Sequence, residues 1–346
     1  MLNRKETEII GFLKNNPGSS SKEIHHGTTT TISYATVKRI LAQLISKNLI
    51  STTGKGKGTK YFISVTYELL DPIDPARYYE KEIDERQIRE NFNHDLIPSV
   101  LHFNDIFTRG EYAKLEDLQT TYRQNISQLS GSAYRKELEK LAIDLSWKSS
   151  QIEGNTYSLL ETERLLKEKE TAAGKTKEEA IMLLNHKEAI DFIIENPGYL
   201  CPLSVSGIED IHRILVKELA IDYNLRNRRI GITGTNYRPL ENEFQIREAL
   251  ANMCDLVNRK ENVFEKALLS LVLISYIQPF MDGNKRTARI VSNAVLIYHG
   301  HCPMSFRTVD SVEYKKAMLL FYEQNNISYI KDIFISQFEF SVRTYF

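Results

Sequence analysis

Cysteine is scarce in this chain of 346 residues, and long apolar runs are absent. The three cysteines, Cys201, Cys254 and Cys302, lack the paired spacing of a disulfide framework or a zinc ribbon, which indicates a reducing compartment. The longest apolar run, Ala267 to Ile277, is far shorter than a membrane span, and no charged-then-apolar leader opens the chain. The sequence also shows no internal repeat and no low-complexity tract. We therefore expect a soluble cytoplasmic protein with no membrane partner.

The chain also has a formal net charge of zero, because 45 Lys and Arg balance 45 Asp and Glu. The balance hides an asymmetry. Residues 1–66 hold ten Lys or Arg against three Glu, a net charge of +7, so the remainder carries −7. A basic head on an acidic body favours separate partners for the two parts. The length is sufficient for two domains with a well-buried core.

The basic head shows the order helix, helix, helix, hairpin. Apolar residues at helical spacing predict helices at Glu6–Asn15, just after the caps at Ser19–Ser21, and at Ser33–Lys47. Two strand-like runs, Leu49–Thr53 and Thr59–Val65, flank a glycine-rich tip. This order resembles a winged helix-turn-helix, an α+β module whose third helix enters the DNA major groove while the wing lies along phosphates.

The resemblance makes DNA a candidate partner of residues 1–66. Lys38 and Arg39 on the third helix and Lys55 and Lys57 at the wing tip are the candidate DNA-binding residues. The positive charge and the composition of the wing both favour this function. Small winged helices also serve as protein-docking modules, and Lys-rich turns are often merely solvated, so that alternative stays open.

The rest of the chain is predicted to be mainly α-helical. Residues 67–95 are interpreted as a linker, because Asp71-Pro72 and Asp74-Pro75 break regular structure before a charged helical stretch at Glu80–Glu90. Residues 96–346 form the second domain. Helical periodicity there predicts helices at Glu137–Ser149, Leu159–Glu170, Lys177–Glu195, Val205–Glu218, Gln245–Arg259, Phe264–Ile277, Arg286–His299 and Ser311–Gln324.

The stretch from residue 278 to residue 289, QPFMDGNKRTAR, is the central feature of this domain. Apolar-periodic runs on both sides predict a helix, a short loop and a second helix. Gly283 and Asn284 at such a helix start present backbone N–H groups without intrahelical partners, which favours a bound anion such as phosphate. Arg286 and Arg289 lie three residues apart on one face, close enough to contact the same polyphosphate.

The same stretch resembles the signature of the Fic family, His-x-Phe-x-Asp/Glu-Gly-Asn-Gly-Arg-x-x-Arg. The match covers Phe280, Asp282, Gly283, Asn284, Arg286 and Arg289. Two positions depart from it, because Gln278 stands at the catalytic histidine and Lys285 at the second glycine. The resemblance implies a Fic helical bundle with a short β-hairpin flap, ATP and Mg²⁺ as cofactors, and Asp282 as the metal-binding carboxylate. It also implies that ATP is bound by residues 283–286 and Arg289.

The two departures bear on the reaction that the resemblance implies. Fic proteins typically move AMP from ATP to a hydroxyl of a target protein, and their relative Doc, with Lys at the second glycine position, moves a phosphoryl group. The amide of Gln278 can orient a hydroxyl but cannot accept its proton. General acid–base catalysis contributes about 10²–10⁴-fold, so transfer should be slow. Glutamine does orient the nucleophile in some GTPases, so transfer is not excluded.

A second motif, Ser149 to Asn155, resembles the inhibitory motif Ser/Thr-x-x-x-Glu-Gly/Asn of Fic proteins. A glutamate presented from a helix end can pair with the arginine that would otherwise hold the γ-phosphate. The resemblance implies that Glu153 pairs with Arg289, with Ser149 as the first residue of the motif. The alternative is an ordinary helix C-terminus with Gly154 as its cap.

A third segment, Arg228 to Arg238, alternates isoleucine with small residues and is predicted to form a short hairpin with an edge strand. It resembles the Fic flap, which pairs with an extended segment of the target protein. Ile232, Gly234 and Thr235 are the candidate target-binding residues. A surface hairpin without a partner is the alternative.

We expect, on these grounds, a Fic-type protein adenylyltransferase scaffold that is inhibited by Glu153 and joined to a DNA-binding winged helix. The alternatives are a nucleotide-binding transcription regulator that acts through the winged helix and a Doc-like protein phosphotransferase. The target protein, the DNA sequence and the oligomeric state, a homodimer included, stay open.

Overall fold

The computed structural model describes residues 3–28 and 32–346, which divide into two compact units, residues 1–72 and 73–346. Each unit is described by itself. The linker expected at residues 67–95 is shared between them, because 67–72 belong to the first unit and 73–95 to the second. No helix among the described residues is long and apolar enough to cross a bilayer.

The first unit contains helices α1 (Arg4–Asn15), α2 (Ser21–Gly27), α3 (Tyr34–Ser46) and α4 (Val65–Leu70) and strands β1 (Ile50–Thr53) and β2 (Lys60–Ile63). Both α1 and α2 begin with a capping box, in which the N-cap side chain and a glutamate three residues later satisfy the first N–H groups. The strands pair antiparallel, with Ile50 opposite Ile63. A 3₁₀ turn at Gly56–Gly58 lies in the wing tip.

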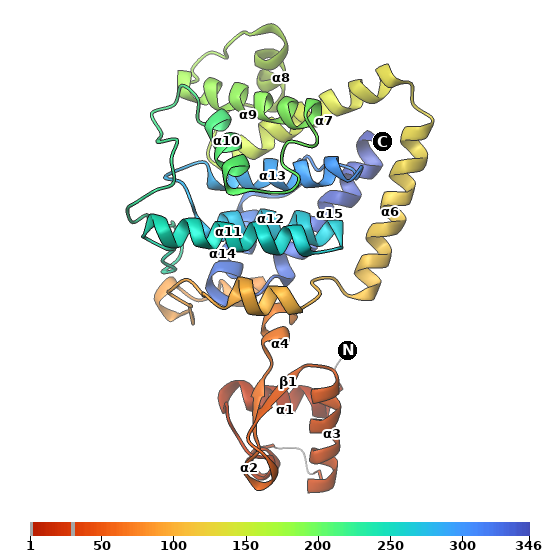
Figure 1. The fold of residues 1–346 in the computed structure, drawn as a ribbon, viewed down its shortest axis with the longest axis vertical. Coiled ribbons are helices and arrows are strands. Elements are labelled where there is room, and N and C mark those ends of the chain that lie inside the picture. Colours follow the sequence, from red (N-terminus) through yellow and green to blue (C-terminus); the bar gives the residue numbers. More distant parts are fainter. Residues whose placement is uncertain (1–2, 29–31) are drawn as a thin grey trace. The chain divides into compact units, whose positions relative to one another are not determined.

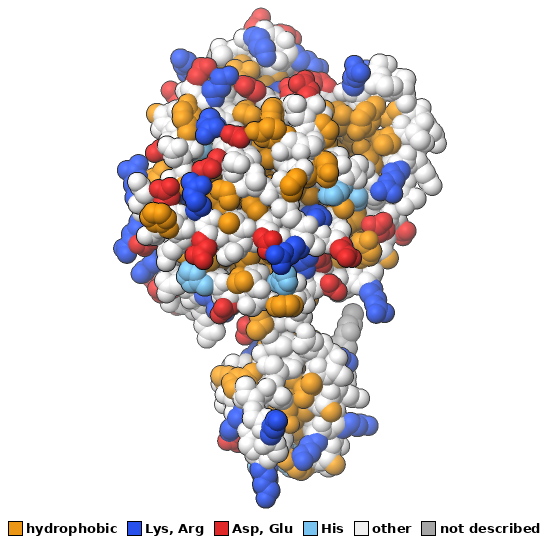
Figure 2. All heavy atoms as spheres, viewed as in Figure 1, with side chains coloured by type: hydrophobic (Ala, Val, Ile, Leu, Met, Phe, Trp, Pro, Cys, Tyr) orange, Lys and Arg blue, Asp and Glu red, His pale blue; other side chains and the backbone are white. Residues whose placement is uncertain are grey.

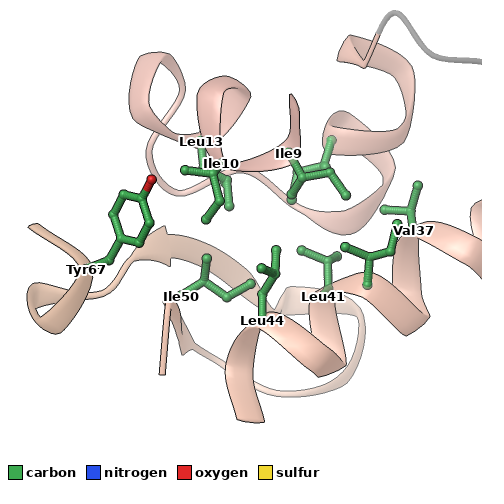
Figure 3. Packing of buried hydrophobic residues seen from close by; sticks show 10 residues of the cluster. Ile9, Ile10, Leu13, Val37, Leu41, Leu44, Ile50 and Tyr67 are labelled. Carbon is green, nitrogen blue, oxygen red and sulfur yellow. The ribbon is translucent and has the colours of Figure 1, made fainter. Parts of the chain in front are cut away.

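Apolar side chains from α1, α3 and β1 meet in the core of this unit (Figure 3). Leu13, Val37 and Leu44 are fully buried there, and Tyr67 of α4 packs against the same cluster. The order and packing of these elements confirm the winged helix-turn-helix fold expected from the sequence.

The second unit is built almost entirely of helices. They are α5 (Pro75–Tyr78), α6 (Arg109–Ser127), α7 (Gly131–Ile152), α8 (Leu159–Glu168), α9 (Lys177–Glu195), α10 (Val205–Leu215), α11 (Glu243–Arg259), α12 (Val263–Ile277), α13 (Asn284–Tyr298), α14 (Ser311–Gln324) and α15 (Ser328–Tyr345). A π-helical segment, Leu96–Leu101, precedes α6. Helices α12 and α13 pack along each other at the centre, where α9 and α10 cover α13 while α11 and α14 cover α12 (Figure 1). The helical fold is the one expected from the sequence.

Two local predictions are wrong. The stretch Glu80–Glu90 forms only a 3₁₀ turn, Ile83–Glu85, because it has no apolar stripe that a helix could bury. Its one buried side chain, Arg86, pairs with Glu323 of α14. The hairpin expected at 228–238 does not form: the described residues there contain a turn at 233–234 and a single bridge from Arg238 to Asn91. The backbone of this segment bonds to other parts of the chain, so no partner strand of its own is needed.

Candidate functional site

The loop between α12 and α13 is held closed by one asparagine side chain. Asn284 Oδ1 accepts a hydrogen bond from the Phe280 N–H at 2.8 Å, and Asn284 Nδ2 donates to the Phe280 carbonyl at 2.8 Å. The same Nδ2 donates to Gln278 Oε1 at 2.9 Å. Left-handed backbone at both ends turns the chain, with φ of 51° at Gln278 and 82° at Gly283. The loop is therefore preorganised without a ligand.

The side chain of Gln278 belongs to this framework. Its Nε2 donates to the Ser275 carbonyl at 2.7 Å, while its Oε1 accepts from Asn284, and the residue is 6% exposed. Both ends of the amide are thus engaged within the protein. An amide has no basic lone pair at neutral pH, so this side chain can support the loop but cannot act as a base.

His212 of α10 supports the loop from the side. Its ring stacks in parallel on Phe280 with 3.6 Å between centroids. Its Nε2 lies 3.0 Å from the Asp282 carbonyl, the shorter of its two carbonyl contacts, so the neutral ring donates there. Burial lowers the pKa of His212 to about 4, and this effect outweighs the two carbonyl contacts, which raise the pKa. A Cβ at Gly283 would come within 3.4 Å of this ring and of Val216, so the backbone fits closely.

Arg226 supports the loop from the segment that precedes the flap. Its Nε donates to the Gln278 carbonyl at 2.6 Å, and its backbone N–H donates to the Pro279 carbonyl at 3.0 Å. These carbonyls follow the C-terminal end of α12, where a cation is favourable. Burial lowers the pKa of Arg226 to about 10. Neither Arg226 nor His212 was identified from the sequence, and both lie more than fifty residues away from the loop that they hold.

The start of α13 is suited to an anion. Gly283 occupies the N-cap position and supplies no side-chain cap, so the first N–H groups of the helix are left for a ligand. Asp282 is 60% exposed beside them and pairs with Arg286 at 3.2 Å. The described residues contain no group of three carboxylate, histidine or cysteine side chains that could hold a metal alone. Asp282 suits Mg²⁺ only together with phosphate oxygens, which is how this ion is commonly bound.

A buried ion pair joins α13 to the end of α7. Arg289 Nη2 lies 2.9 Å from Glu153 Oε1, and Lys285 Nζ lies 3.3 Å from Glu153 Oε2. Burial raises the pKa of Glu153, but the charges of Arg289 and Lys285 outweigh it and the net pKa is lowered. The carboxylate is therefore ionised near neutral pH and neutralises two cations of the loop.

Ser149 extends the same cluster one turn earlier in α7. Its Oγ accepts from Arg289 Nε at 2.8 Å, and its carbonyl accepts from Arg289 Nη2 at 3.0 Å. The hydroxyl lies 2.6 Å from His186 Nε2, and burial lowers the pKa of His186 well below its ordinary value, so this ring is neutral. Arg289 Nη1 is buried with no hydrogen-bond partner within the described residues, so an acceptor is still wanted there.

The candidate flap residues are connected to the loop only through their neighbours. Gly234 has a φ of 92°, and its carbonyl accepts a hydrogen bond from Arg86. The Thr235 hydroxyl accepts one from the Tyr237 N–H at 3.1 Å. Ile232 is half-buried. Tyr237 is buried, and its hydroxyl donates to the Tyr276 carbonyl at 3.0 Å, two residues before the loop.

The candidate DNA-binding residues are exposed in the first unit. Lys38 and Arg39 lie on α3, and Lys55 and Lys57 lie in the tip between β1 and β2. The Lys38 ammonium lies 5.1 Å from the centre of the Tyr34 ring. On the face in Figure 2, Lys and Arg side chains stand out from this unit with little Asp or Glu beside them.

Comparison with known proteins places both units. Residues 202–296 match the Fic/DOC family, and residues 2–71 match the penicillinase repressor family. The chain is 30% identical over 172 residues to the protein adenylyltransferase Fic of Nematostella vectensis, which covers 48% of this chain and 40% of the relative. It is 26% identical over 171 residues to the protein adenylyltransferase fic-1 of Caenorhabditis briggsae, covering 47% of this chain and 33% of the relative. The chain thus spans well under half the length of these relatives.

Solved structures share the fold of the second unit. Fic-1 from Caenorhabditis elegans (residues 134–508) superimposes with a TM-score of 0.61 at 19% identity, over 72% of this chain and 73% of that one. A Fic domain containing signaling protein from Bacteroides thetaiotaomicron gives a TM-score of 0.55 at 20% identity, over 66% of this chain and 94% of that one. The sequence match and the shared fold agree with the signature at residues 278–289. The chain therefore contains a Fic domain and, at its N-terminal side, a winged-helix domain that matches the penicillinase repressor family.

Proposed function

We propose that the second unit binds ATP with Mg²⁺ at residues 282–289 and transfers AMP to a hydroxyl group of a target protein, with pyrophosphate as the leaving group. The preformed loop supports this proposal most directly, because Asn284 already fixes the backbone whose N–H groups would receive phosphate oxygens. The relatives that carry the name protein adenylyltransferase point to the same reaction.

Each residue of the loop has a role in this proposal. The N–H groups at the start of α13 hold phosphate oxygens, and Arg286 and Arg289 add charge-assisted bonds to them. Asp282 holds Mg²⁺, which neutralises the charge that develops on the phosphate oxygens when bound. Gln278 takes no proton from the attacking hydroxyl, so that proton passes to water, and transfer is about 10²–10⁴-fold slower than with a base in this place.

Glu153 restrains the site in this proposal. Its ion pair with Arg289 withdraws the guanidinium from the γ-phosphate, and nucleotide must displace the carboxylate before Arg289 is free to bind it. The neighbouring orphan N–H of Arg289 supports this assignment, because a γ-phosphate would supply the missing acceptor.

Mass spectrometry of the purified protein after incubation with ATP and Mg²⁺ tests the reaction. The wild type is compared with Gln278→His, Glu153→Gly and the double variant. We expect an added AMP group in the double variant and little or none in the wild type. An added phosphoryl group would instead support a Doc-like phosphotransferase. Absence of any adduct in all four proteins, together with retained ATP binding, would refute self-modification and favour nucleotide binding without transfer.

Gln278 also favours a second candidate, a nucleotide-responsive transcription regulator. Its amide is engaged on both sides by the loop, which keeps a binding site in shape without supplying a base. In this function the winged helix binds DNA, and ATP alters its affinity for DNA. Reciprocity requires that DNA alter the affinity for ATP by the same factor, so measuring both affinities tests it. Equal DNA affinity with and without ATP would contradict this candidate.

A further inference from the structure

A short segment that enters the second unit packs beside the candidate flap. We call residues 84–91 the strap. The Arg238 N–H donates to the Glu90 carbonyl at 2.6 Å, and Arg238 forms a parallel bridge with Asn91. Asn236 Nδ2 donates to Asp84 Oδ1 at 3.2 Å. The strap therefore takes backbone and side-chain positions along 236–238 that would otherwise be open to another chain.

Arg86 is the strongest contact between the strap and the flap. Its Nη2 donates to the Gly234 carbonyl at 2.9 Å, and its Nη1 donates to both carboxylate oxygens of Glu323 at 3.0 and 3.2 Å. The Arg86 and Glu323 side chains are 4% and 0% exposed. The guanidinium also lies 5.2 Å from the centre of the Tyr79 ring. Nε of Arg86 has no hydrogen-bond partner among the described residues, so the bonds of Nη1 and Nη2 hold this buried guanidinium in place.

Two further observations place the turn that Arg86 holds close to α14 and to the end of α12. Gly234 has a φ of 92°, and a Cβ there would come within 3.2 Å of Leu319 on α14. The hydroxyl of Tyr237 ties the far side of the turn to the carbonyl of Tyr276 at the end of α12. The flap is thus held between the strap and the helix that leads into the nucleotide loop.

We propose that Arg86 is a positioning residue for the flap. It holds the Gly234 carbonyl against α14 and keeps the strap beside 236–238, so that an extended segment of a protein substrate would meet the flap at residues 231–233, ahead of the positions that the strap takes. The part concerning substrate rests on the proposed function, whereas the part concerning flap conformation does not.

Hydrogen exchange at the flap tests the proposal in the full chain. The double variant Arg86→Met with Glu323→Gln removes the guanidinium without leaving a buried charge alone. The matched control is Lys331→Met with Glu111→Gln, which removes another ion pair of the second unit, 2.9 Å long, between α15 and α6. We expect exchange of the Tyr237 and Arg238 amides to rise about tenfold in the first variant, the effect of losing one bond to a charged donor. The control should leave these amides unchanged.

Arg86→Lys supplies a conservative test, because it keeps the charge near Glu323 but loses the forked geometry. It should restore part of the protection. Unchanged exchange at 237–238 in the Arg86 variant, or an equal rise in the Lys331 control, would overturn the proposal. The affinity of each variant for ATP with Mg²⁺ is measured in parallel and should stay within about twofold of wild type, since the bonds of the strap among the described residues go to the flap and to α14. If neither the wild type nor Glu153→Gln binds ATP, the proposed function is refuted. The hydrogen-exchange result on the conformation of the flap does not depend on that outcome.

Discussion

Lys285 should have opposite roles in the closed and the open site, and a double-mutant cycle with Glu153 measures this. In the closed site Lys285 pairs with Glu153 and so strengthens the restraint. Once Glu153 is displaced, the same ammonium is free for the phosphates of ATP. Lys285→Met therefore loosens the restraint and weakens the open site at once. The two effects oppose each other in the wild type but not in Glu153→Gln, where the restraint is already lost.

The structure gives the size of these effects. The Lys285 and Glu153 side chains are 23% and 18% exposed and 3.3 Å apart, which places their pair near the upper end of the surface range, about 0.5–1 kcal/mol. That energy corresponds to about two- to fivefold in affinity. Arg289 is fully buried against the same carboxylate, and hydrogen bonds to charged groups contribute about 1.5–3 kcal/mol. Glu153→Gln should therefore raise ATP affinity at least about tenfold.

Titration calorimetry with ATP and Mg²⁺ on the wild type, both single variants and the double variant supplies the four affinities. We expect Lys285→Met to change ATP affinity by less than about twofold in the wild type but to weaken it about two- to fivefold in Glu153→Gln. Thermal unfolding of each variant controls for loss of fold. An equal effect of Lys285→Met in both backgrounds would refute the role of Lys285 in the restraint.

Three further predictions follow from the charges and pKa values of the site and the wing. The pKa of His212 is lowered to about 4, so between pH 6.5 and 4 the unfolded chain binds more protons than the folded one. The free energy of unfolding should therefore fall by about 3 kcal/mol over this range because of His212. Urea unfolding should show a smaller fall for His212→Phe than for the wild type. The pKa of Glu153 is lowered below 4.5, so the stability it contributes is present above that pH and lost below it; the ratio of ATP affinities of Glu153→Gln and wild type should stay constant from pH 5 to 8 by calorimetry. Replacing Lys55 and Lys57 by Gln should weaken DNA binding and reduce the salt dependence by about two ions in fluorescence anisotropy, whereas Lys14→Gln, a control beside Asp71, should not.

Local sequence signals predicted most of the helices. Lys177–Glu195 and Ser311–Gln324 were predicted with the observed bounds, because a capping residue and a stop signal flank a clear apolar period. Helices α6 and α15 were not predicted. The buried side of α6 includes Gln119, and the buried side of α15 includes Lys331 and Gln337, so polar residues interrupt the period that marks a helix.

The contacts of the candidate site were also predicted only in part. Glu153 and Arg289 were paired from their motifs, and the structure brings them into contact. The second cation on Glu153, Lys285, was assigned only to ATP, because no local pattern shows which side chain a lysine will meet. Arg226 and Arg86 had no signal at all. Each donates to backbone carbonyls far along the chain. Every residue has such a carbonyl, so the sequence does not show which one will accept the bond.

The engaged amide of Gln278 explains how a site can keep its shape without its base. A histidine at this position would compete for the same partners, the Ser275 carbonyl and the Asn284 amide, with a ring that is rigid and reaches them differently. Glutamine satisfies both with one planar group, and Asn284 then keeps its two bonds to Phe280. Closure of the loop and the geometry of the helix start therefore depend on hydrogen bonds that the amide makes. Only proton transfer depends on a base. In the proposed function the glutamine that slows transfer also engages the loop, so nucleotide affinity and transfer rate should be separable.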